Sequence, residues 1–151
     1  MFSISFLDNA ATIDGPGGNI NIGAGSGIAE EGLDFEPTGD ANTMTIGADG
    51  MGQHAMSADR SGTITVRTMT VSPVNAQLQD MLTYQRESSA NWGRNRIVIS
   101  NPARGDILVA SHVAFAKQTP YKAGKDPGVI EWTFHAIRVS VKRGPGLPED
   151  F

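Results

Sequence analysis

Few residues in this chain have the side-chain chemistry of a reactive site, and they are scattered. No two of the three histidines, His54, His112 and His135, have the short spacing that places two imidazoles together as zinc ligands. Cysteine is absent, so thiolate metal sites and disulfides are excluded. The sequence therefore predicts no metal centre.

The other candidate motifs also lack the spacing that their chemistry needs. The glycine-rich run GAGSG at residues 23–27 has no G-x-S-x-G nucleophile turn. It also fails as a phosphate-binding loop, because Ile28 stands where the dinucleotide fingerprint requires glycine. Glu30, Glu31 and Asp34 could act together on a metal or a proton, but no histidine supports them at ligand spacing. We expect no catalytic residue, no cofactor and no enzymatic activity.

One segment, at about residues 73–87, has a convincing helical pattern. Ser72 can cap the first turn because its hydroxyl can accept a hydrogen bond from a free amide. Pro73 suits the first helical position, where an N–H would have no partner. The apolar residues recur at helical spacing and form one stripe, as in a helix that packs on a core: Val74, Leu78, Met81 and Leu82.

Most other segments have the alternation of β-strands. Phe2, Ile4 and Phe6 alternate with serines, which predicts a strand. The glycine-rich turn at residues 14–18 leads into alternating residues 19–22 and predicts a hairpin. Further strands are expected at residues 96–100, 106–117 and 129–141.

Two strands change the side on which their apolar residues lie. Ile64 and Val66 are followed by Met69 and Val71, and a similar change occurs within residues 130–141. A shift of one residue indicates a β-bulge or a strand that crosses from one sheet to another. We therefore expect a mainly β fold, a rolled antiparallel sandwich or barrel, with the single helix on its flank.

The region at residues 23–60 is rich in glycine and contains only short strand patterns. So long a region within a compact domain usually has a function, and we expect a long protruding loop or extended hairpin. Residues 142–151, KRGPGLPEDF, have the composition of an extended arm. At 151 residues the chain has the size of a single domain, residues 1–151.

The chain is acidic and sparsely charged, with a net charge of −4, a pI near 5.2 and 19% charged residues. It lacks the basic patch of a duplex-binding domain. No apolar run is long enough to span a membrane, and the first residues lack the basic region of a secretory signal. We expect a protein that is made in the cytoplasm and has no membrane partner.

Several strings, in order along nearly the whole chain, resemble a family of bacteriophage tail tube proteins from contractile-tailed phages. None of them is a catalytic motif, so the resemblance concerns architecture and not chemistry. They are SFLD at residues 5–8, DGPGG at 14–18, GIAEEG at 27–32, NTMTIGADG at 42–50, GTITVR at 62–67, SPVNA at 72–76 and VIEWTF at 129–134.

The resemblance implies a structural subunit of the virion. Six copies of such a protein form a ring whose inner sheets join into one barrel, and the rings stack into a hollow tube. The resemblance implies as partners other copies of the chain, the tail sheath protein, the tape measure protein and the baseplate. Double-stranded DNA would pass through the lumen without specific binding, since a chain with a charge of −4 repels phosphate.

Two sets of residues acquire expected roles in such a tube. The long region is expected to mediate contacts between copies, because exposed methionines are enriched at interfaces; the residues are Glu30, Glu31, Asp34, Met44, Ile46, Met51 and Met56. Threonine-rich strand faces are expected to line the lumen: Thr43, Thr45, Thr63 and Thr65. The alternatives are another tail component such as a tail terminator, a secretion-type tube subunit, and a small β-barrel that binds a ligand.

Overall fold

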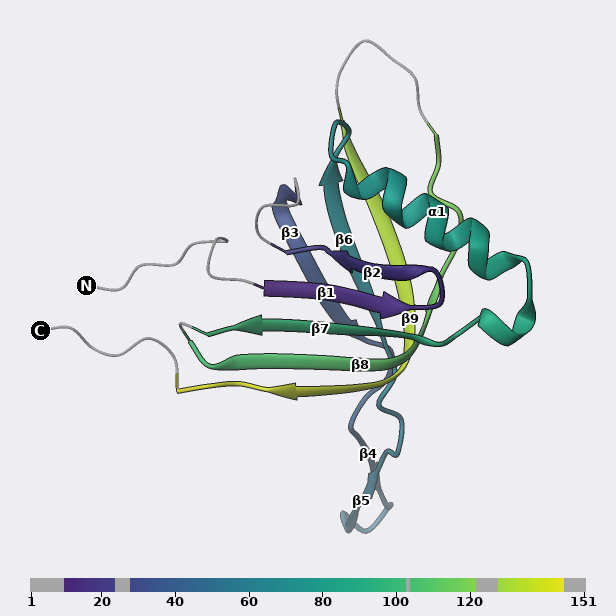
Figure 1. Ribbon diagram of the computed structural model, residues 1–151. Helices are drawn as coiled ribbons and strands as arrows, with labels where there is room; N and C mark the ends of the chain where they lie inside the picture. The colour runs from purple at the N-terminus through teal and green to yellow at the C-terminus, as the bar shows by residue number, and fades with distance from the viewer. Residues whose placement is uncertain (1–9, 24–27, 103, 122–127, 146–151) are drawn as a thin grey trace, which may run out of the picture.

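The computed structural model describes residues 10–23, 28–102, 104–121 and 128–145 (Figure 1). The strand predicted at Phe2 to Phe6 and the end of the arm at residues 146–151 lie outside these ranges. The helical elements are α1 (Val74–Arg86) and the short 3-10 helix η2 (Ser89–Asn91). The strands are β1 (Ala10–Gly15), β2 (Gly18–Asn21), β3 (Ile28–Pro37), β4 (Asn42–Ile46), β5 (Gly52–Met56), β6 (Gly62–Met69), β7 (Asn95–Asn101), β8 (Asp106–Phe115) and β9 (Val129–Lys142).

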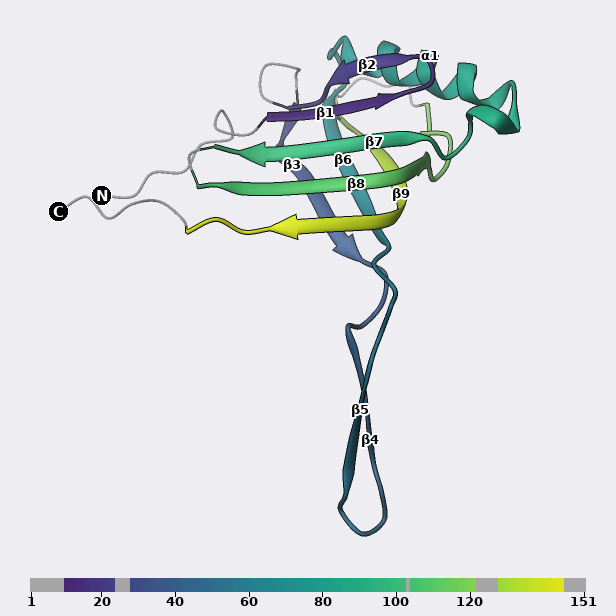
Figure 2. The same ribbon diagram turned by 60° about the horizontal axis from the view of Figure 1, so that its bottom comes forward.

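Seven strands form one antiparallel sheet in the order β2-β1-β7-β8-β9-β6-β3. The long strand β9 pairs with β6 through its first half and with β8 along its second half. The sheet therefore folds over into two layers, with β3 and β6 in one and β1, β2, β7 and most of β8 in the other (Figures 1 and 2). The predicted mainly β, rolled antiparallel fold with one flanking helix is confirmed, as an open sandwich with β2 and β3 at its edges.

The change of phase predicted for β9 is confirmed. Trp132, Phe134 and Ala136 are buried on one alternation, and Val139 is buried on the other. Two consecutive exposed residues, Ile137 and Arg138, separate the two alternations. β9 therefore contributes core residues to both layers, which is possible because it crosses from one layer to the other.

A bulge in β8 lies at the level of this crossing. Asn95 and Ile97 of β7 pair with Val113 and Ala110 of β8, so β8 has one residue more than its partner between these two pairs. His112 lies in the bulge with φ 53°, in the left-handed region that a side chain with a Cβ rarely adopts. No signal in the sequence marked this histidine, because the backbone strain arises only when β8 pairs with two neighbours.

Replacing His112 by glycine is expected to leave the stability unchanged or to raise it by up to about 1 kcal/mol, because glycine adopts a positive φ without strain. Replacing it by valine is expected to cost about 1–2 kcal/mol, because a β-branched residue is least compatible with this conformation. Urea denaturation measures both changes. His135→Val, at an exposed position of ordinary strand backbone in β9, is the control; a loss there as large as that of His112→Val would contradict the explanation.

The change of phase predicted for β6 is wrong. Alternate residues remain buried from Gly62 to Thr68, the strand ends at Met69, and Val71 lies beyond it with 83% of its surface exposed. Thr68 can take an inward position because its hydroxyl donates a hydrogen bond to the side-chain oxygen of Asn75. A polar residue that has a hydrogen-bond partner thus continues the alternation of buried residues in β6, although the sequence predicted that this alternation ends before it.

The helix agrees with its prediction to within one residue at each end. The Ser72 hydroxyl accepts a hydrogen bond from the Val74 amide at 3.2 Å, as expected of a cap. The helix packs against β2 (Figure 1), and the predicted stripe is buried: Val74, Leu78, Met81 and Leu82.

The sequence did not predict that the helix also buries a polar residue, Gln85. Its side chain forms two hydrogen bonds with the side chain of Asn95, 2.7 and 3.0 Å long, and donates one of 2.8 Å to the Pro16 carbonyl. Gln85 and Asn95 are almost fully buried. The pair therefore joins the end of the helix to β7 and to the turn of the first hairpin.

Gln85→Leu is expected to lower the free energy of unfolding by about 2–3 kcal/mol, because it leaves the Asn95 amide buried without its partner. Equilibrium urea unfolding measures this loss. Gln79→Leu, which removes a solvent-exposed hydrogen-bonded pair with Gln118, should change the stability by less than about 0.5 kcal/mol. Equal losses in the two variants would show that the buried amide pair contributes nothing specific.

The predicted protruding region is shorter than residues 23–60, because residues 28–37 form strand β3 of the main sheet. A separate hairpin of β4 and β5 projects from the end of the sandwich (Figure 2). At its base the Asp59 carboxylate accepts hydrogen bonds from the hydroxyl and the amide of Ser61, which lower the pKa of Asp59 below its ordinary value.

Candidate assembly surfaces

The projecting hairpin has two chemically different faces. Met44 pairs across the ribbon with His54, and Ile46 with Gly52. Because side chains alternate along a strand, Met44, Ile46 and Met56 share one face, together with Asn42 and His54, which are hydrogen-bonded to each other. We name it the apolar face of the hairpin after its three large apolar side chains. The opposite face has no large apolar side chain and carries Thr43, Thr45, Gln53 and Ala55.

The apolar face is unusually exposed for its composition. Met44 is 61% exposed and Met56 92% exposed, and Met51 at the tip is 73% exposed. Single exposed apolar residues are common, but a group on one projecting element indicates an interaction surface. Methionine is flexible and adapts to irregular surfaces, so this face is suited to contact with another protein surface.

A second surface is the outward side of β3, β6 and the first half of β9. The core side of these strands carries Phe35, Ile64 and Phe134, which pair in register. The outward side of the same strands has one apolar pair, Met69 and Val129, at the end of the β6–β9 pairing. The other outward residues are polar, and we name them the acidic face: Asp34, Glu36, Thr63, Thr65, Arg67, Glu131, Thr133 and His135.

The one guanidinium of the acidic face is neutralised locally. Arg67 lies between Asp34 and Glu131, with Nη1 bound to the carboxylate of Asp34 and Nε 3.4 Å from that of Glu131. The face has three carboxylates and one guanidinium, and therefore a net charge of −2. Exposed ion pairs contribute little to stability, so the main consequence is a surface with negative charge and no free cation.

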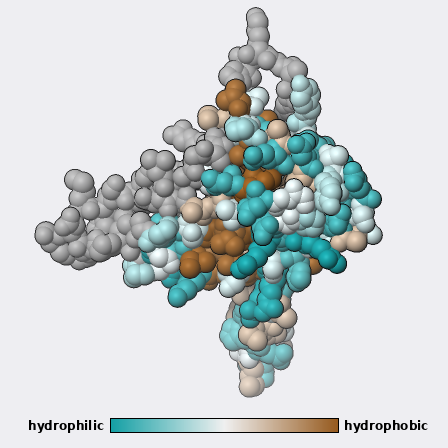
Figure 3. Space-filling view, in the orientation of Figure 1, coloured by the Kyte–Doolittle hydropathy of each residue, from teal (hydrophilic) through white to brown (hydrophobic). Residues whose placement is uncertain are grey.

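The outward side of the other layer has the opposite charge. Arg96, Arg138 and Lys142 are exposed there with a single carboxylate, Asp14, which gives a net charge of +2. Figure 3 shows hydrophobic side chains gathered over β7 and β8 within this surface. We name it the basic face; its apolar members are Val98, Ile107 and Val109.

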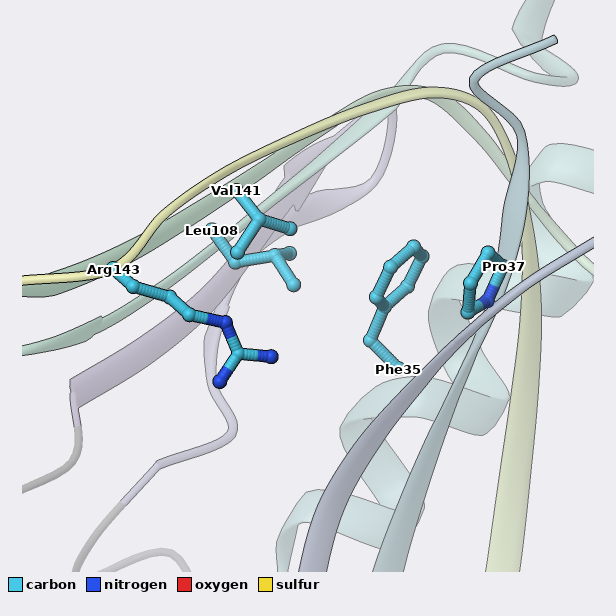
Figure 4. A pocket seen from close by; sticks show the side chains of 5 residues that line it. All are labelled: Phe35, Pro37, Leu108, Val141 and Arg143. Carbon is cyan, nitrogen blue, oxygen red and sulfur yellow. The ribbon is translucent and has the colours of Figure 1, made fainter. Parts of the chain in front are cut away.

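A groove opens into the core between the two layers. Phe35 and Pro37 of β3 face Leu108 and Val141 across it, and Arg143 lies at its rim (Figure 4). The volume of the groove is about 610 Å³. Val141 remains 48% exposed although it lies next to the core, so the interior is incompletely covered at this point.

The structure does not bring each predicted set of residues together. Of the set expected to mediate self-assembly, Met44, Ile46, Met51 and Met56 lie on the hairpin, whereas Glu30, Glu31 and Asp34 belong to β3. Of the set expected to line a lumen, Thr43 and Thr45 lie on the hairpin, and Thr63 and Thr65 on the acidic face.

The histidines, the other possible metal ligands and the helices were the remaining candidates for a functional site. His54, His112 and His135 lie on three different strands, β5, β8 and β9. No group of three or more metal-ligating side chains gathers in the described part of the chain. Among the helices described there, none combines the length and the apolar character needed to cross a membrane.

Three solved structures have a similar fold over nearly their whole length. The anti-feeding prophage cap, a tube-terminating cap, has 13% identity and a TM-score of 0.55, covering 95% of this chain and 93% of its own. The PVC sheath/tube terminator of an extracellular contractile injection system has 18% identity and a TM-score of 0.59, covering 94% and 98%. The PVC sheath-tube complex has 14% identity and a TM-score of 0.53, covering 94% and 93%.

At these identities the three structures establish the fold and nothing more specific. No curated protein matches the sequence. The family model described as "Bacteriophage PhiTE tail tube protein" matches residues 1–144. The chain therefore belongs to the PhiTE family of bacteriophage tail tube proteins.

Proposed function

We propose that this chain is the structural subunit of a phage tail tube, with six copies in each ring and rings stacked into a hollow tube that conducts DNA from the capsid to the host. The chain would be made in the host cytoplasm and would have no reactive centre of its own. The observation that carries the proposal is the separation of its surface into an acidic face, a basic face and an apolar hairpin. Exposed apolar side chains that gather on one projecting element are typical of an interaction surface.

In the proposed tube the acidic face lines the lumen. Negative, polar walls repel the phosphates of DNA, whereas each cation that binds a phosphate adds affinity and would hold the DNA in place. Arg67 is the one guanidinium among the described residues of the acidic face, and its pairing with Asp34 and Glu131 neutralises it. Thr63 and Thr65 would lie on the channel wall, as the sequence predicted.

The basic face then lies on the outside of the tube. A surface with an apolar centre and a charged surround is typical of a protein interface. This face would contact the tail sheath protein, and the ends of the tube would meet the tape measure protein and the baseplate. The hairpin projects from the end of the sandwich (Figure 2), and in the proposed tube its apolar face would contact a copy in the adjacent ring.

A tail terminator is a second candidate, because two of the similar structures are terminators of contractile systems. The two functions differ in what the purified protein does alone. A tube subunit adds rings without limit, since each ring presents the same surfaces as the last, whereas a terminator stops after one ring.

Negative-stain electron microscopy of the purified chain at increasing concentration tests the proposal. Long hollow filaments of constant diameter are expected. Single rings at every concentration would assign the chain to the terminators. Monomers under all conditions, confirmed by light scattering, would contradict both functions.

A further inference from the structure

Among the strands that the structure describes, β3 has a partner on one side alone, and it borders the open part of the core. This partner is β6, so that β3 forms one edge of the described sheet. An edge strand presents unpaired N–H and C=O groups that can bind another strand. The groove beside it is apolar, with Phe35 and Pro37 on one wall and Leu108 and Val141 on the other (Figure 4). The free edge of β3 and the groove beside it together form a site for one additional strand.

Residues 2–6 of the sequence have the pattern that this site requires. Phe2, Ile4 and Phe6 alternate with serines, so a strand of these residues would direct three large apolar side chains to one side. β3 has the same alternation, with Leu33 and Phe35 towards the core and acidic residues outward. An added strand would therefore fill the groove and place its serines beside the acidic face.

The place where these residues join the described part of the chain is also suitable. Nine residues precede Ala10 and can span up to about 30 Å when extended. Ala10 lies in one row of paired residues that crosses four neighbouring strands. The row continues through Ser100 and Ile107 to Lys142, which is next to Val141 of the groove. The preceding residues thus leave β1 at the end of the sheet where the groove opens.

We propose that residues 2–6 of one copy bind as a strand along β3 of a neighbouring copy and fill its groove. This inference rests on the proposed function, because it supplies the link that closes a ring. In the proposed ring each copy must be joined to the next, so the strand is assigned to a second copy. Binding of residues 2–6 in the groove of their own chain is the alternative that a double variant detects.

The absence of cysteine allows a direct test by disulfide cross-linking between two single variants. Ile4→Cys and Val141→Cys proteins are purified separately, mixed under assembly conditions and oxidised, and the products are separated on a non-reducing gel. A heterodimer that carries one cysteine from each variant is expected. Since a stable contact holds the two thiols at a high effective concentration, its yield should exceed that of a control mixture at least about tenfold.

The control mixture contains Ser3→Cys and Val141→Cys, because residue 3 would point away from the groove. Equal yields in both mixtures would overturn the proposal, as would a disulfide that forms only within an Ile4→Cys, Val141→Cys double variant. Filaments without the heterodimer would overturn this inference and leave the tube function standing. The heterodimer without filaments would support the strand exchange and count against the tube.

Discussion

Replacing Met44 by aspartate is expected to abolish tube assembly while the chain remains folded. Met44 is 61% exposed on the projecting hairpin, so a carboxylate there costs the monomer little. In the proposed tube the same side chain is buried against a copy in the next ring. Burying an unpaired carboxylate costs on the order of 3 kcal/mol or more, which is about a hundredfold in the affinity of each contact.

The measurement is the critical concentration for filament formation, by sedimentation and electron microscopy, with circular dichroism as the check on folding. Thr45→Asp is the matched control, because Thr45 directly follows Met44 on the same strand and so lies on the opposite face of the ribbon. Filaments of Met44→Asp at the wild-type concentration would show that the apolar face lies outside the interface. Equal loss in Thr45→Asp would show that the two faces are not distinguished.

The second large effect is expected when the charge of the acidic face is reversed. Glu36→Lys together with Thr65→Lys changes the net charge of this face from −2 to +1 per copy, and it leaves Arg67 and both of its carboxylate partners in place. Tubes of the double variant should retain duplex DNA at low salt, because every lysine near a phosphate releases counterions. Retention should fall by about a thousandfold or more between about 50 and 200 mM salt.

The readout is DNA that co-sediments with the tubes and survives added nuclease. Wild-type tubes should retain none. Thr12→Lys with Ser140→Lys adds two lysines to the basic face instead, and DNA bound there should be digested. Protected DNA in this control, and not in the Glu36→Lys, Thr65→Lys variant, would place the basic face in the lumen and refute the proposed orientation.

The local elements could be predicted well from the sequence. The helix followed from Ser72, Pro73 and one apolar stripe, because capping and amphipathic period depend on residues within a few turns of each other. The first hairpin and the phase change of β9 followed in the same way from glycine-rich turns and alternation. The family followed from strings in order along the chain, and the family model matches residues 1–144.

The expected site residues could be found by type but not grouped correctly. Met44 and Thr45 are neighbours in the sequence, yet they lie on opposite faces of the hairpin because strand side chains alternate. Thr65 and Asp34, far apart in the sequence, share the acidic face because β3 pairs with β6. Arg67, which the sequence did not single out, joins that face through its two carboxylate partners.

The sequence by itself thus determined the helix and most of the strands, how much charge the chain carries, and that no cysteine chemistry is possible. Only the tertiary structure decided how that charge is divided, with −2 on one outward face and +2 on the other. The physical reason is that charge and polarity belong to single residues, whereas a face is made by pairing strands that are distant in the chain. The bulge at His112 and the groove beside β3 have the same origin, because both arise where the two layers of one sheet meet.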